Sequence, residues 1–294
     1  MKSLNRMPLS DAIRQGTITL QEVQIETASL DAQLIAAYVL QRDRLYVLTN
    51  PQMELTAEQA QTFFALIKRR SKFEPITHIT RTCEFMALEF EVDEHVLIPR
   101  PDTEILVEAA IAKIREQDVR HALEIGVGSG CIAVSLAVNC PDVYITAVDI
   151  SPKALEVAKR NAITHSVAER ISFAEGDVFA SICEELELAG QFGMIISNPP
   201  YISVDEMAQL EPNVHDFEPH TALFGGDDGL DFYREISRRA PSLLEPAGMI
   251  MFEIGCDQAM PVHNILSECG FVDIATMRDL ADKDRVVYGT YHGA

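Results

Sequence analysis

Cysteine and long apolar runs are both scarce in this sequence. The 6 cysteines, at positions 83, 131, 140, 183, 256 and 269, form no CxxC pair and have no histidine at zinc-ligand spacing. This argues against a zinc site or a disulfide framework and favours reduced thiols in the cytosol. The longest apolar run, residues 131–138, is far shorter than the roughly 20 residues that span a bilayer. No signal-peptide pattern occurs near the start, so we expect a soluble, cytoplasmic protein without a metal.

Basic residues are also few, and their deficit is confined to one part of the chain. The sequence has 24 Lys and Arg against 45 Asp and Glu, a formal charge of −21. Through Pro75 the counts are 9 against 8, and beyond it they are 15 against 37. An acidic field repels phosphate backbones. We therefore expect a protein partner, with no stable nucleic-acid complex and no membrane association.

The first 75 residues predict a small helical domain. At 294 residues the chain exceeds the usual single domain of roughly 100 to 200 residues. Apolar residues such as Leu30, Leu34 and Ala37 recur at helical spacing. Thr56 and Gln59 form a capping-box pattern that predicts a helix over residues 57–70. The pattern leaves open whether this domain is a structural appendage or a module that grips a substrate.

Residues 76–98 predict a β-hairpin that links this domain to the next. Its β-rich stretches are residues 89–92 and 95–98. The nearby Phe85-Met86-Ala87 segment lacks a glycine that a hairpin would favour.

Residues 99–294 predict an α/β domain. Short apolar strands alternate with helical patterns, at residues 121–125, 144–148, 171–174, 194–197 and 249–254. The last two stretches, 271–278 and 285–291, have no helix between them and predict an antiparallel hairpin.

Three glycines follow the first of these strands. Gly126, Gly128 and Gly130, with Val127 and Ser129 between them, precede a helix that begins at Cys131. Such a turn lets the backbone pass close beneath a ligand. A dinucleotide fingerprint requires a third glycine where Cys131 stands, which argues against a nicotinamide enzyme.

The next two strands end in carboxylates that suit a nucleoside. Asp149, followed by Ile150, could accept both hydroxyls of a ribose. Ser151 and Pro152 already supply the start of the next helix, so that role does not require Asp149. Asp177 and its neighbour Val178 could contact an adenine, although Gly176-Asp177 is also a common turn.

The fourth strand runs into Asn198-Pro199-Pro200-Tyr201. Consecutive prolines remove two N–H donors and stiffen the backbone. The Asn198 side-chain oxygen and the Pro199 carbonyl could then each accept one hydrogen of a planar NH2 group, while the Tyr201 ring packs on it. The motif predicts a site for an amino or amide nitrogen.

Together these motifs resemble the class I amino-methyltransferases, and the wider pattern is similar to the HemK-type release-factor glutamine methyltransferases. The further matching segments are residues 98–104, 217–219, 225–233, 253–255 and 284–287. The resemblance implies a seven-stranded Rossmann-like methyltransferase fold, S-adenosylmethionine as cofactor, and the glutamine of the Gly-Gly-Gln loop of release factors as acceptor. It also implies that Thr103 and Glu104 contact the methionine end of the cofactor.

Three positions depart from the pattern of that family, namely Glu124, Val127 and Val178. These positions could alter cofactor affinity. The alternative functions are an exocyclic-amine methyltransferase acting on nucleic acid, a noncatalytic nucleoside-binding module, and a nicotinamide oxidoreductase. A basic groove would favour the first alternative. The intact Asn198 motif argues against the second, and Cys131 against the third.

Overall fold

The computed structural model describes residues 6–179 and 190–293. The chain folds into two compact units, one of Met1–Thr82 with Pro212–Phe217 and one of Cys83–Glu211 with Glu218–Ala294. None of the helices in the described residues is long and apolar enough to cross a membrane. Cys183 lies outside the described residues, and the other five cysteines carry free thiols.

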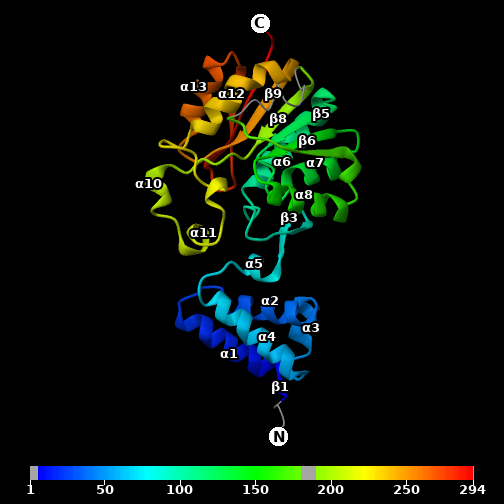
Figure 1. Ribbon diagram of the computed structural model, residues 1–294, viewed down its shortest axis with the longest axis vertical. Helices are drawn as coiled ribbons and strands as arrows, with labels where there is room; N and C mark the ends of the chain where they lie inside the picture. Colours follow the sequence, from blue (N-terminus) through cyan, green and yellow to red (C-terminus); the bar gives the residue numbers. More distant parts are fainter. Residues whose placement is uncertain (1–5, 180–189, 294) are drawn as a thin grey trace. The chain divides into compact units, whose positions relative to one another are not determined.

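The first unit is a small helical bundle, drawn in blue and cyan in Figure 1. Its helices are α1 (Leu9–Glu22), α2 (Ala28–Leu40), α3 (Arg44–Thr49), α4 (Ala57–Arg70) and α5 (Ile76–Thr80), and short strands β1 (Met7–Pro8) and β2 (Glu54–Leu55) pair antiparallel. The capping box is confirmed, because Thr56 accepts from the Gln59 amide and Gln59 accepts from the Thr56 amide. Buried Asp31 pairs with Arg70 at 2.7 Å and joins α2 to α4.

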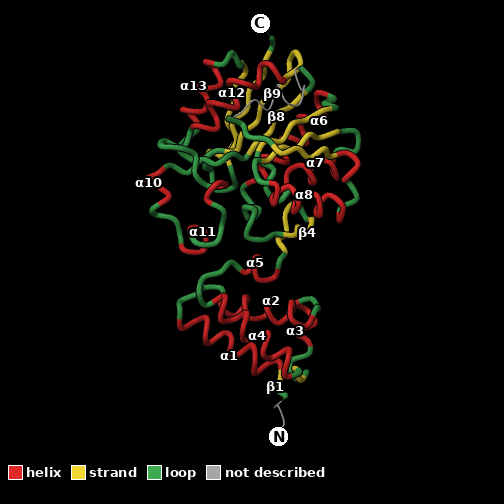
Figure 2. Tube along the Cα trace, in the orientation of Figure 1, coloured by secondary structure: helices red, strands yellow, loops and turns green. Residues whose placement is uncertain are grey.

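The second unit is a seven-stranded sheet between helices, and it confirms the predicted fold class (Figure 2). Its strands run in the order β10-β11-β9-β8-β5-β6-β7, and only β11 runs antiparallel to its neighbours. The strands are β5 (His121–Ile125), β6 (Tyr144–Asp149), β7 (Ile171–Glu175), β8 (Phe192–Ser197), β9 (Leu244–Glu253), β10 (Val272–Arg278) and β11 (Asp284–Tyr291). The predicted terminal hairpin is β10 with β11.

Two apolar layers hold helices against this sheet. Helices α6 (Thr103–Gln117), α7 (Cys131–Asn139) and α8 (Pro152–Thr164) pack in one layer, and α12 (Asp231–Leu243) and α13 (Ala259–Glu268) pack in the other. Shorter helices are η1 (Ala168–Arg170), α10 (Val204–Met207) and η2 (His220–Ala222), while α11 (Pro212–His215) belongs to the first unit. Because both faces of the sheet are covered, its central strands are apolar throughout rather than alternating.

A hairpin is present within residues 76–98, but its strands do not lie where the sequence predicted them. Residues 76–80 form helix α5, and the paired strands are β3 (Thr82–Phe85) and β4 (Leu88–Glu91). The turn between them holds Met86 and Ala87 at φ of 53° and 57°, a conformation that usually favours glycine. His95–Ile98 is not a strand, because the Asp93 carboxylate accepts the His95 amide at 2.9 Å and turns the chain locally.

Candidate active site

The carboxyl ends of β5 and β8 meet where the chain order of the sheet reverses. After β5 the chain builds β6 and β7 on one side, and later it returns to place β8 and β9 on the other. The Ser197 hydroxyl donates to the Ile125 carbonyl at 2.6 Å and ties the two strand ends together. Such a switch point opens a crevice for ligands.

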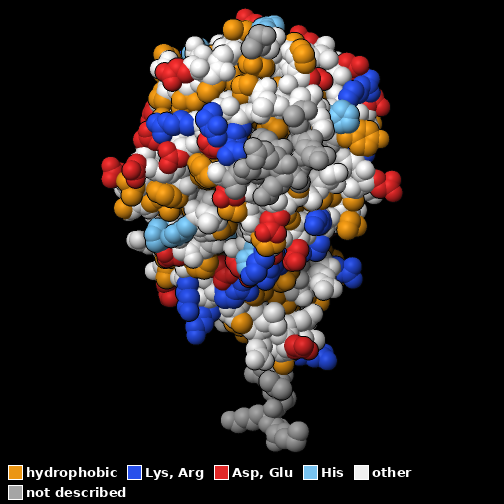
Figure 3. Space-filling model, turned by 45° about the horizontal axis from the view of Figure 1, so that its top comes forward, with side chains coloured by type: hydrophobic (Ala, Val, Ile, Leu, Met, Phe, Trp, Pro, Cys, Tyr) orange, Lys and Arg blue, Asp and Glu red, His pale blue; other side chains and the backbone are white. Residues whose placement is uncertain are grey.

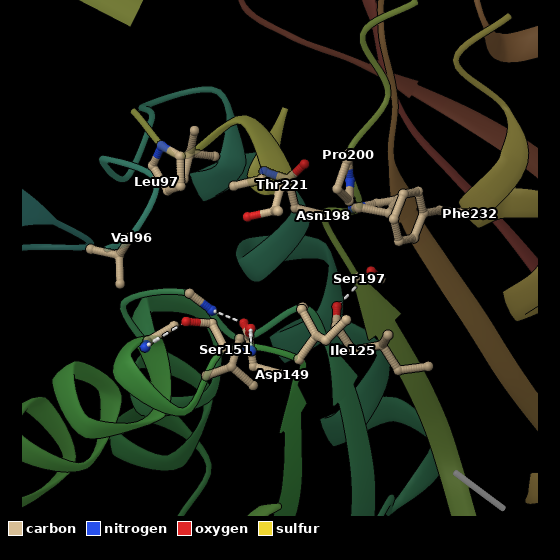
Figure 4. A pocket seen from close by; sticks show the side chains of 18 of the residues that line it. Val96, Leu97, Ile125, Asp149, Ser151, Ser197, Asn198, Pro200, Thr221 and Phe232 are labelled. Atoms are coloured by element: carbon tan, nitrogen blue, oxygen red, sulfur yellow. Dashed lines mark hydrogen bonds between the residues drawn. The ribbon is translucent and has the colours of Figure 1, made fainter. Parts of the chain in front are cut away.

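A cavity of about 710 Å³ occupies this edge of the sheet, within the range of small-molecule sites. Most of the predicted site residues line it, namely Gly126, Val127, Gly128, Ser129, Asp149, Ile150, Asp177, Val178, Asn198, Pro199, Pro200 and Thr103. Figure 4 shows Asp149 and Asn198 on different sides of the cavity, with Val96 and Leu97 across from them. The structure therefore brings together the strand ends that the sequence singled out.

The glycine turn needs its glycines. Gly126, Gly128 and Gly130 have φ of +78°, +55° and +80°, in the left-handed region where a Cβ is strained. The Gly126 amide donates to the Val148 carbonyl at 2.8 Å, which fixes the turn beside β6. Gly130 is not part of the cavity wall. A Cβ there would lie 3.0 Å from that of Ala158, so this glycine lets α7 pack on α8.

Asp149 is held rigidly at the end of β6. Its Oδ2 accepts from the Gly128 amide and its Oδ1 from the Ser151 amide, both at 2.8 Å. The Ser151 hydroxyl accepts from the Ala154 amide, so the predicted N-cap of α8 is confirmed. Burial raises the pKa of Asp149 in spite of these hydrogen bonds. Each carboxylate oxygen retains a lone pair for a ligand donor.

An aromatic edge adjoins Asp177. The Asp177 Oδ1 accepts from the Phe179 amide at 2.9 Å. The Phe179 ring meets Phe232 edge to face with ring centres 4.9 Å apart. With Val178 they give this end of the cavity an apolar wall beside one carboxylate, which suits a flat heterocycle that carries an amino group.

Asn198 forms a hydrogen bond with Thr103. Its Nδ2 donates to the Thr103 hydroxyl at 3.3 Å, which leaves Oδ1 as the acceptor for a ligand. Thr103 is buried at the first turn of α6. Glu104 is not part of the cavity wall, because its Oε1 accepts from the Met86 amide at 2.6 Å and ties α6 to the β3–β4 turn.

Tyr201 lies beside the cavity rather than in its wall. Its side chain packs against the apolar layer that contains α12 and α13. The side-chain amide of Gln258 donates through Nε2 to the Tyr201 backbone carbonyl at 3.0 Å. Burial, with the nearby Glu253 carboxylate, raises the pKa of Tyr201 to about 12. The phenol is therefore neutral near pH 7 and does not serve as a general base.

The sequence reasoning missed part of the cavity wall. The irregular segment 95–100 contributes His95, Val96, Leu97, Pro99 and Arg100, and the segment after β8 contributes Met207, His220, Thr221 and Phe224. The Arg100 guanidinium donates to Glu218 at 2.5 Å, and the buried Glu218 also accepts from the Ile98 amide at 3.4 Å. Arg100 and Glu218 lie in stretches that matched the family pattern, so that signal was present for them, but their pairing came only from the fold. Most of the other wall residues in these segments lie outside those stretches.

Two family models match the chain. The PrmC N-terminal domain matches residues 11–80, and the methyltransferase small domain matches residues 101–212. The first match lies within the helical unit. The second includes the glycine turn, Asp149 and the Asn198 motif.

Curated relatives match nearly the whole chain. The release factor glutamine methyltransferase of Clostridium acetobutylicum is 41% identical over 98% of this chain and 100% of its own length. That of Geobacter sulfurreducens is 41% identical over 92% of each chain. Among solved structures, a methyltransferase from Pyrococcus furiosus shares the fold, with a TM-score of 0.50 at 16% identity over 71% of this chain and 91% of that one.

Proposed function

Because this chain belongs to the release factor glutamine methyltransferase family, we propose that its cavity is the site where the side-chain amide nitrogen (N5) of a release-factor glutamine is methylated. The observation that carries the proposal is the placement of Asn198 and Pro199 in the cavity wall, with Asn198 Nδ2 engaged by Thr103. Two acceptor oxygens, Oδ1 of Asn198 and the carbonyl of Pro199, are then available to a planar NH2 group.

The residues present fit S-adenosylmethionine. The bare backbone of the glycine turn leaves open space where a Cβ at Gly128 would stand. Asp149 would hold the ribose hydroxyls, Asp177 the adenine amino group, and Ile150, Val178 and Phe179 the adenine ring. When bound, the cofactor supplies a methyl group activated by a positively charged sulfur.

The chain contributes mainly positioning and charge at the reacting nitrogen. Asn198 and Pro199 each accept a hydrogen bond from the amide, and these two bonds orient it. By holding both N–H groups they help the nitrogen become pyramidal, so that its lone pair can accept the methyl group. No base is needed beforehand, because the nitrogen becomes acidic as it is alkylated and can release a proton to solvent. Tyr201, as a neutral and partly buried side chain outside the cavity wall, would support the Pro199-Pro200 segment.

We propose that the helical unit grips the release factor and leaves the chemistry to the second unit. The match of residues 11–80 to the PrmC N-terminal domain supports this division. The exposed apolar side chains Leu45 and Leu48 of α3 offer contact area. Because release factors act in translation termination, the reaction belongs to the cytoplasm.

A nucleic-acid acceptor is the alternative that shares the Asn198 chemistry. The formal charge of −21 opposes it. On the face drawn in Figure 3, Lys and Arg side chains are interspersed with Asp and Glu. A protein acceptor is therefore favoured.

The direct test is transfer of labelled methyl from S-adenosylmethionine to a purified release factor. We expect label on the wild-type factor and none on a factor whose loop glutamine is replaced by asparagine, because the shorter side chain cannot reach the acceptors. Total RNA and duplex DNA are run as parallel acceptors. Label on nucleic acid with none on the factor would reject the substrate and retain the amino-methyltransferase chemistry.

Gly225 offers a test of how closely the Pro200-Tyr201 backbone must be placed. A Cβ at Gly225 would lie 2.6 Å from the Pro200 carbonyl oxygen and 2.7 Å from Tyr201 Cα. We expect Gly225→Ala to displace this segment and lower kcat by about tenfold to a hundredfold, since small misplacements of reacting groups have costs of that size. Cofactor affinity, measured by calorimetry, should change by less than about threefold.

The matched control is Gly193→Ala, at the opposite end of β8. There the added methyl would lie 2.7 Å from the flexible end of Glu245 and 3.1 Å from Val119 Cγ1, away from the Asn198 motif. Equal kcat for the Gly225→Ala and wild-type enzymes would show that the segment tolerates the shift.

A further inference from the structure

Glu253, the last residue of β9, is a buried carboxyl that the proposed chemistry does not yet use. Glu253 is only 1% exposed to solvent. Within the described residues, its Oε2 has no hydrogen-bond partner. An orphan carboxylate oxygen in a core is costly and is seldom retained without a role.

The neighbours of Glu253 connect it to the Asn198 motif. Strand β9 pairs with β8 so that Phe252 lies opposite Ser197, which places Glu253 beside the start of the Asn198 motif. The side chains of Thr103 and Asn198 lower the pKa of the Glu253 carboxyl group, and Asn198 Nδ2 donates to Thr103 at 3.3 Å. Glu253, Thr103 and Asn198 therefore form a cluster, here called the Glu253 triangle. Glu253 itself is not part of the cavity wall, so it acts only through Asn198.

The triangle bears on the orientation of the Asn198 amide. A side-chain amide has a donor end and an acceptor end, and exchanging them would aim Nδ2 instead of Oδ1 at the substrate NH2. A carboxylate can only accept, so it binds Nδ2 and rejects Oδ1. The Thr103 hydroxyl alone cannot discriminate, because a hydroxyl both donates and accepts.

We propose that the Glu253 carboxylate is a positioning residue that fixes the Asn198 amide with Oδ1 toward the substrate nitrogen, through direct contact and through Thr103. This inference rests on the proposed function, because it assigns Oδ1 to the glutamine amide. Only the ionised carboxylate enforces the orientation. Once protonated it becomes a donor as well, and the reversed Asn198 amide is accommodated.

The charge state of Glu253 is set by several groups around it. Burial raises its pKa to about 7, against the hydrogen bonds from Thr103 and Asn198 and the charge of Arg285. The other charged or titratable groups that interact with it are Asp102, Tyr201, Tyr233 and Cys131. Tyr201, Tyr233 and Cys131 have raised pKa values and stay neutral near pH 7. Titration of Glu253 therefore falls in the range of assay pH.

The test compares kcat against pH for wild type, Glu253→Gln, Glu253→Ala and the control Glu245→Gln, with cofactor and release factor saturating. Glu245 lies on the same strand at its exposed end. We expect the wild-type kcat to fall on acidification with a midpoint near pH 7, and the control to match it. At pH 8, Glu253→Ala should lose about tenfold to a hundredfold in kcat, the scale of a misplaced reacting group.

Glu253→Gln separates positioning from mere support of the fold. It keeps an acceptor oxygen, so it should recover part of the kcat lost in Glu253→Ala, and its kcat should no longer change between pH 6 and 8. Cofactor affinity should stay within about threefold in both variants. A flat wild-type profile, an acid limb that persists in Glu253→Gln, or a loss confined to KM would overturn the proposal.

Thermal unfolding provides a readout that does not depend on turnover. Because the pKa of Glu253 in the folded protein is raised to about 7 from an ordinary 4.5, its contribution to stability is complete below pH 4.5 and is lost as pH rises through 7. The Tm of Glu253→Gln minus that of wild type should therefore increase from pH 5 to pH 8. A constant difference would contradict the assigned ionisation.

The wild-type assay keeps the two hypotheses apart. No label on the factor defeats the proposed substrate before any variant is compared, and the pH series then uses the acceptor that does take label. Label on the factor, with variants that match wild type, defeats only the role of Glu253.

Discussion

Asn198→Ala is expected to reduce kcat for methyl transfer by about a thousandfold, because removal of one preorganised hydrogen bond at a reacting group costs 10² to 10³. Here the substitution also removes the hydrogen bond to Thr103 and the amide beside Glu253. Single-turnover transfer to the release factor is the measurement. Cofactor affinity should fall by less than about tenfold, since the ribose and adenine contacts lie on other strands.

Asn198→Asp is the matched control for size. The carboxylate keeps two acceptors but cannot donate to Thr103, and it places a second negative charge beside Glu253. We expect a folded enzyme with kcat as low as that of the alanine variant. An Asn198→Ala enzyme within tenfold of wild type would contradict the assignment of the amide acceptor.

Asp149→Ala should weaken S-adenosylmethionine binding by about a hundredfold to a thousandfold, since two hydrogen bonds to a charged group contribute about 1.5 to 3 kcal/mol each. The carboxylate also anchors the Gly128 and Ser151 amides at 2.8 Å, so the glycine turn loosens when it is removed. Isothermal calorimetry measures the affinity directly. The kcat at saturating cofactor should change far less than the Kd.

Asp142→Asn, just before the other end of β6, is the control, because its side chain is exposed and pairs with the exposed Arg120. Burial raises the pKa of Asp149. Cofactor affinity should therefore weaken on acidification at a higher pH than an ordinary aspartate would dictate. If Asp149→Ala bound the cofactor with unchanged affinity, the assignment of the ribose to the end of β6 would be wrong.

The sequence predicted the elements whose signals are local. Alternating strand and helix patterns located β5 to β9 to within a few residues, and the Ser151-Pro152 pair identified the start of α8. Because parallel strands end at one edge of a sheet, the residues after them could be assigned to a common site. The positions of Asp149 and Asn198 in the cavity wall follow from that rule.

Local patterns failed where a distant partner or an unusual turn decides the backbone. Residues 95–98 are rich in strand formers, but the Asp93 turn and the pairing of Ile98 with Glu218 hold them as an irregular wall of the cavity. Glu104 looked equivalent to Thr103 in sequence. The helix places them on different faces, one toward Asn198 and the other toward Met86.

The sequence by itself determined the fold class and the strand ends that carry the candidate site residues, and it predicted the acceptor atoms of the Asn198 motif, because each depends on residues that are neighbours along the chain. Tertiary structure alone decided which end of the Asn198 amide is presented. That choice depends on Glu253, 55 positions further along, and on Thr103, 95 positions earlier. Only the folded sheet brings β9, α6 and the end of β8 together and so places this carboxylate beside the amide.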